Sequence, residues 1–168
     1  DQPLPANPGG QAELQNAIAS LAESQPIESA DPPEITSQIN GKTFTLEENP
    51  LGWFSLAFTF LPGSDTASVL INGEIPGTIG MDNVYRLSGE GITPFPQGLR
   101  GYWENQDTFI GEAILLGQLA HTITRIQFVQ NTILVNVQDL STGDQYEFQG
   151  SLSDTSGLVP VLYYWAQE

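Results

Sequence analysis

The chain has 168 residues, with 20 Asp and Glu against 4 Lys and Arg, which gives a formal net charge of −16. This length fits one ordinary domain that can bury a core without disulfides. So acidic a surface repels phosphate groups, which excludes nucleic acid and anionic lipid as favoured partners. The absence of cysteine excludes a thiol nucleophile and a thiolate zinc site. No apolar run is long enough for a membrane-spanning helix.

The first 34 residues carry six acidic side chains and no basic one. Asn7 can cap a helix with Pro8 at its first position. Leu14, Ala17, Ile18 and Leu21 then follow at i, i+3, i+4 and i+7, the spacing of an amphipathic helix. We therefore predict an acidic linker over residues 1–34 that contains one short helix over about residues 8–23.

From Ile35 onward the apolar period changes from 3.6 to 2, which is typical of strands. Phe54, Leu56, Phe58 and Phe60 are predicted to share one buried face. The pair Asn72-Gly73 predicts a hairpin, because both residues tolerate positive φ. Further strands are expected at Val84–Ser88, Leu99–Glu104, Thr108–Leu116, Thr122–Gln130, Thr132–Leu140 and Gln145–Leu152.

About nine strands with hairpin-length joints indicate a mainly β fold. We predict an up-and-down antiparallel β-barrel over residues 35–152, preceded by the one short N-terminal helix, since closure removes the sheet edges. A two-sheet sandwich is the alternative. Residues 153–168 include the apolar run Leu158–Trp165, which is expected to lie along the barrel as an edge strand or to form an interface.

The sequence contains none of the common hydrolytic motifs. There is no G-x-S-x-G, and the only lysine, Lys42, has Ile39 three residues before it, so S-x-x-K is missing. The single His121 is interpreted as an exposed loop residue, and one histidine cannot form a multi-histidine metal site. Glu104 and Glu112 flank one hairpin and are read as solvated acids, and residues 139–144 as a β-turn and not a calcium loop. We expect no catalytic residues, no metal and no cofactor.

The three arginines stand out because cations are so few. Arg86, Arg100 and Arg125 all fall within predicted strands. One interpretation is an anion-recognising pocket lined by arginine and aromatic side chains. The other is an internal cluster of structural ion pairs with Glu104 or Glu112, or arginines on the outer face that offset the local density of acidic groups. The candidate ligand-binding residues are Arg86, Arg100, Tyr102, Trp103, Glu112 and Arg125.

Several runs in this sequence resemble a known family. These are Ile39–Leu46 followed by Glu48–Gly52, Gly80–Arg86, Leu99–Trp103 and Asp107–Phe109. Together they resemble the C-terminal accessory domain of bacterial serine hydrolases of the class C β-lactamase and penicillin-binding-protein-like group, and residues 3–23 resemble the linker helix of those proteins.

The resemblance implies a lipocalin-like barrel that is not itself an enzyme. In that family the nucleophilic serine, its lysine partner and a tyrosine belong to the catalytic domain, and neither S-x-x-K nor Y-x-N occurs here. The expected function is a non-catalytic accessory domain packed on the catalytic domain of a parent hydrolase, exported from the cytoplasm by family analogy. The alternative is a free-standing lipocalin-like barrel that binds a small apolar or anionic ligand.

Overall fold

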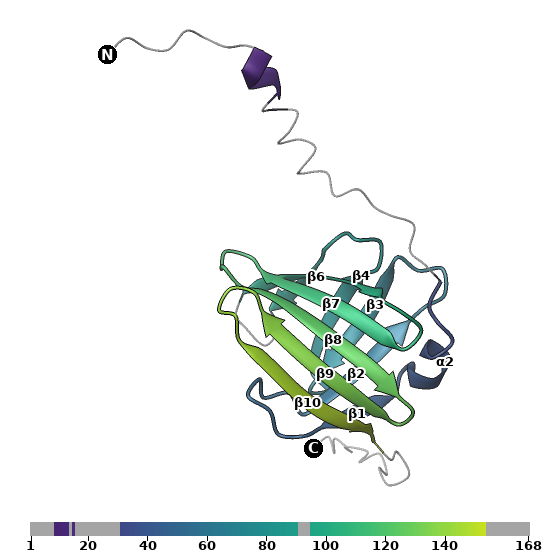
Figure 1. Cartoon of the computed structure of the whole chain (residues 1–168). Helices are drawn as coiled ribbons and strands as arrows, with labels where there is room; N and C mark the ends of the chain where they lie inside the picture. Colours follow the sequence, from purple (N-terminus) through teal and green to yellow (C-terminus); the bar gives the residue numbers. More distant parts are fainter. Residues whose placement is uncertain (1–8, 14, 16–30, 91–94, 154–168) are drawn as a thin grey trace, which may run out of the picture.

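The computed structural model describes residues 9–13, 15, 31–90 and 95–153 (Figure 1). Residues 9–13 are helical, as predicted, whereas the apolar stripe from Leu14 to Leu21 falls almost wholly outside the described residues. The predicted C-terminal edge strand or interface also lies outside them. No described helix is long and apolar enough to cross a membrane.

After the helical residues 9–13, the described elements are one short helix and ten strands. In chain order they are α2 (Thr36–Ile39), β1 (Thr43–Leu46), β2 (Ser55–Phe60), β3 (Thr66–Ile71), β4 (Ile75–Gly80), β5 (Arg86–Glu90), β6 (Pro96–Trp103), β7 (Thr108–Leu115), β8 (His121–Val129), β9 (Thr132–Asp139) and β10 (Gln145–Leu152).

These strands form the predicted up-and-down antiparallel barrel. Strands that follow one another in the chain lie side by side, and β1 pairs with β10, so that Phe44 lies opposite Leu152. Figure 1 shows β7 to β10 crossing in front of β2, β3 and β4. The closure is weakest between β4 and β5, where Gly80 pairs with Arg100 of β6 and the Thr78 amide donates to the Ser88 hydroxyl.

One end of the barrel is closed by aromatic side chains. Phe109 lies 5.3 Å, centroid to centroid, from both Phe60 and Trp103, and Phe128 packs on Trp103 at 5.8 Å. All of these rings come from the parts of their strands that lie nearest to α2. Offset and edge-to-face contacts of this kind stabilise a core beyond the area they bury.

Helix α2 covers this closed end. Its last residue, Ile39, is buried in the core. The next residue, Asn40, accepts the Phe60 N–H through Oδ1 and donates to the Phe60 carbonyl through Nδ2, each at 2.7 Å. The amide thus takes the place of a neighbouring strand for the last residue of β2.

The sequence-based expectations fail in detail at two places. Phe54 was grouped with Leu56, Phe58 and Phe60, but it precedes β2 and its side chain is 61% exposed. Residues 36–39 are helical although the alternating pattern was expected to start at Ile35. The turn follows Pro32-Pro33, and the Thr36 hydroxyl donates a hydrogen bond back to the Pro33 carbonyl. The hairpin at Asn72-Gly73 is confirmed, with φ of 57° and 73°.

The cross-strand pair Gly101 and Gly111 gives a matched test of the packing at the closed end. A Cβ on Gly101 would lie 2.4 Å from Phe109 Cζ and 2.7 Å from the Ile110 carbonyl, whereas a Cβ on Gly111 meets nothing closer than 3.7 Å. We expect Gly101→Ala to lower the free energy of unfolding by about 1–3 kcal/mol in urea titration. Gly111→Ala should leave it unchanged or raise it by up to about 1 kcal/mol. Equal losses of unfolding free energy in both variants would show that the packing of the Phe109 ring is not the reason for glycine at position 101.

Candidate ligand-binding cavity

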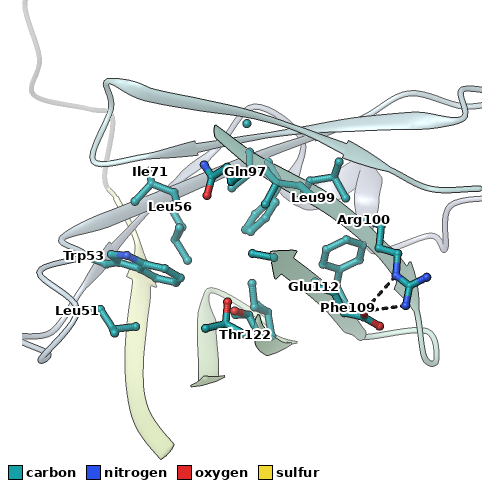
Figure 2. Close-up of a pocket in the computed structure, with 18 of the residues that line it drawn as sticks. Leu51, Trp53, Leu56, Ile71, Gln97, Leu99, Arg100, Phe109, Glu112 and Thr122 are labelled. Atoms are coloured by element: carbon teal, nitrogen blue, oxygen red, sulfur yellow. Dashed lines mark hydrogen bonds and ion pairs between the residues drawn. The ribbon is translucent and has the colours of Figure 1, made fainter. Parts of the chain in front are cut away.

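The barrel encloses a cavity of about 310 Å³ toward the end opposite α2. It lies above the aromatic rings, among the parts of the strands that adjoin the loops at 47–54, 72–74, 116–120 and 140–144. Apolar side chains make most of its wall, as Figure 2 shows for Leu51, Trp53, Leu56, Ile71, Leu99 and Phe109.

The β1–β2 loop places Leu51 and Trp53 against the cavity, and two asparagine side chains hold that loop. Asn49 Oδ1 accepts hydrogen bonds from the Leu51 and Trp53 amides, each at 3.2 Å. Asn72 Oδ1 accepts the Phe54 N–H at 2.8 Å, and its Nδ2 donates to the Gly52 carbonyl at 3.0 Å. Because side-chain amides satisfy the loop backbone, its apolar residues can face inward.

Four polar side chains also face the cavity. Alternation along each strand puts Gln97 on the same face as Leu99, Thr122 and Thr124 on the same face as Ile126, and Asp139 on the same face as Val137. Ile126 and Val137 are buried core residues, which identifies these faces as the inner ones.

Arg100 and Glu112 border the cavity, but their side chains lie on the outer face of the barrel. They alternate with the inward Leu99 and Phe109, and they share a face with Gly98, beside which Tyr85 packs from outside. Glu112 Oε2 accepts hydrogen bonds from Arg100 Nη2 at 2.8 Å and from the Tyr85 hydroxyl at 2.9 Å. In Figure 2 this pair lies at the side of the pocket away from Leu51 and Trp53.

The Glu112 carboxylate stays charged in this setting. Burial by itself would raise its pKa, since the side chain is only 14% exposed. The hydrogen bonds from Arg100 and Tyr85, together with the charge of Arg100, outweigh burial and hold the pKa of Glu112 below its ordinary value. Burial, together with the hydrogen bond to Glu112 and the charge of Glu112, raises the pKa of Tyr85.

The structure does not bring the other four candidate residues together around the cavity. Arg125 pairs with Glu104 on the outer face, and Tyr102 is 50% exposed. Trp103 belongs to the aromatic cluster at the closed end. Arg86 pairs with Asp82 at 2.8 Å and with Asp65 at 3.0 Å, also at the closed end. The pairings match the structural ion-pair interpretation, and a ligand-binding role for these residues stays a prediction.

The remaining polar features are structural. His121 begins β8 and faces outward, with Nε2 at 3.5 Å from Glu112 Oε2. Glu104 and Glu112 hold separate arginines and share no cleft. Asp139 Oδ1 accepts the Ser141 and Thr142 amides, the pattern of the turn that was expected there. The described residues contain no group of three or more potential metal ligands.

Sequence reasoning missed most of the cavity wall. Leu51 lies within one of the runs that carried the family resemblance, and no motif marked Trp53, Gln97, Thr122 or Thr124. The available signal was strand parity: Thr122 and Thr124 stand four and two residues before the apolar Ile126. Parity alone does not distinguish a cavity wall from a filled core.

No family model matches the chain, and no curated protein matches it. Among solved structures, it is similar to As-p18, an extracellular fatty acid binding protein, at 9% identity and a TM-score of 0.48, over 73% of this chain and 99% of that one. It is also similar to secretory abundant heat soluble protein 4 from Ramazzottius varieornatus, at 14% identity and a TM-score of 0.46, over 83% and 86% of the two chains. Neither likeness bears on the ligand of this chain.

The resemblance to the accessory domain of serine hydrolases is wrong. The two solved structures reported above are a fatty acid binding protein and a secretory heat-soluble protein, and no family model matches the chain. The physical reason is that runs such as Ile39–Leu46 and Leu99–Trp103 contain strand and turn patterns that any barrel of consecutive hairpins requires. Such runs indicate the barrel architecture and not membership of a particular family.

The outer-face ion pair predicts a pH-dependent contribution to stability. Glu112→Gln should lower the free energy of unfolding at pH 7 by about 1–3 kcal/mol, because Arg100 loses its charged partner. A lowered pKa in the folded state means that the advantage of the wild type is present above the ordinary glutamate pKa and is lost as the pH falls through the folded pKa. Urea denaturation of both proteins at pH 7 and at acid pH measures this difference in the free energy of unfolding.

The control for this test is Glu104→Gln, which removes a charge of the same sign from an exposed pair. Its effect at pH 7 should stay within about 0.5 kcal/mol. If the difference in the free energy of unfolding between wild type and Glu112→Gln were as large at acid pH as at pH 7, the assignment of the pH dependence to Glu112 would be contradicted.

Proposed function

We propose that this chain is a binding protein that holds a small apolar molecule in the cavity of its barrel. The observation that carries the proposal is the cavity of about 310 Å³ within an otherwise filled interior. Ligand pockets in proteins are concave, mostly apolar and supplied with a few polar groups. The wall described above has that composition.

The two ends of the barrel differ in a way that supports this function. At one end the ring contacts of Phe60, Trp103 and Phe109 fill the interior. Toward the other end, the inward positions of the same strands carry Gly111, Ala113 and Thr122, which are too small to fill it. A barrel selected only for stability would fill this space, because empty apolar volume costs free energy.

The size of the cavity limits the ligand. A water molecule has a share of about 30 Å³ in the liquid, so the space corresponds to on the order of ten to twenty non-hydrogen atoms. Exposed apolar side chains of Leu116, Leu119 and Leu140 occupy the turns at the same end, and Leu119 is 95% exposed. They give an apolar ligand a surface to contact before it enters.

A cavity-filling variant tests the proposal. Binding of the neutral fluorophore N-phenyl-1-naphthylamine should weaken at least tenfold in Ala113→Phe. Ala113 lies on β7, between β6 and β8, and lines the cavity, so the added ring would fill part of the cavity. Leu134→Phe adds an aromatic ring on the outer face of β9 and should bind the probe like the wild type. Circular dichroism of each variant shows that the barrel is retained. Unchanged binding in Ala113→Phe would locate the ligand elsewhere.

A further inference from the structure

The charged residues that border the cavity differ in whether their side chains lie on the inner or the outer face of the barrel wall. Three charged residues border it: Arg100, Glu112 and Asp139. The first two point outward and neutralise one another. Among the described residues that border the cavity, Asp139 is therefore the charged group whose side chain lies on the inner face, and no arginine or lysine side chain shares that face.

Asp139 is held at the mouth of the cavity by its own turn. It ends β9 and pairs across the strands with Thr122, another residue of the cavity wall. Its Oδ1 accepts the Ser141 amide at 2.7 Å and the Thr142 amide at 3.2 Å. The side chains of Ser141 and His121 also interact with this carboxylate, the first by a hydrogen bond and the second by its charge. The backbone hydrogen bonds lower the pKa of Asp139, so the carboxylate is charged at neutral pH.

This arrangement decides which head group an apolar ligand can carry. A carboxylate drawn into the cavity would lose water without meeting an arginine or lysine side chain on the inner face, and it would approach the charged Asp139; both effects oppose binding. An ammonium group placed at the mouth would instead donate a charge-assisted hydrogen bond to the Asp139 carboxylate. A hydroxyl group could make a weaker neutral bond to the same carboxylate.

We propose that the cavity selects apolar amines, with the ammonium group bound by Asp139, and discriminates against carboxylates of the same chain length. The inference rests on the proposed function, because it names the ligand class of that same cavity. It also replaces the anionic alternative, in which arginine side chains would have recognised the ligand.

The test is a competition series with one alkyl chain and three head groups. Decylamine, decanol and decanoate would each displace N-phenyl-1-naphthylamine at pH 7 and about 0.15 M salt, where a Debye length of about 8 Å reduces the general attraction of the acidic protein for cations. We expect decylamine to bind at least tenfold more tightly than decanoate, with decanol between them. Decanoate binding as well as decylamine would overturn the inference and leave the proposed function intact.

Two matched variants separate a local effect from the net charge. Asp139→Asn keeps an Oδ1 acceptor for the turn and removes the charge, so the ratio of amine to carboxylate affinity should fall to about threefold or less. Asp144→Asn removes the same charge from the same turn, at an exposed residue outside the cavity wall, and should keep the ratio. An equal fall in both variants, or no fall in Asp139→Asn, would overturn the role of Asp139.

Failure of the proposed function would look different. In that case neither the fluorophore nor any member of the series would bind the wild-type chain at all. The ranking in the wild type needs no variant to fold, so it tests the head-group inference even if Asp139→Asn is unstable.

Discussion

The packing of Phe109 against Gly101 is the contact on which the rest of this structure depends. Because residue 101 has no side chain, the tip of the Phe109 ring can lie close to the β6 backbone, with its centroid 5.3 Å from those of Phe60 and Trp103. These rings close one end of the barrel, and α2 covers it. The interior is thereby divided into a filled part and an open part, and the open part provides the site.

The second constraint is the alternation of side chains along each strand. It assigns Leu99 and Phe109 to the interior and leaves Arg100 and Glu112 on the outside. The outer pair is satisfied by its own hydrogen bonds and by Tyr85, so it imposes no charge on the interior. An acidic protein with few cations thus keeps its arginines for structural pairs and presents a nearly apolar cavity.

The loops at the open end have a role that no motif describes. Asn49 and Asn72 bind the backbone around Gly52 and allow Leu51 and Trp53 to turn toward the cavity. The turn that starts at Asp139 fixes a carboxylate at the same end. The proposed head-group contact and the apolar part of the cavity wall therefore come from different hairpins, which are brought together only when β1 pairs with β10.

The sequence by itself determined the barrel class, most strand positions and the Asn72-Gly73 hairpin, because period-two alternation and positive-φ residues act over a few neighbouring residues. It also determined that S-x-x-K and multi-histidine chemistry are absent from this chain. Only the tertiary structure decided that Arg100 faces outward, that Trp103 closes one end and that Asp139 lies at a cavity. Those outcomes depend on which strands pair and on where large rings meet glycines, and such contacts join residues far apart in the chain.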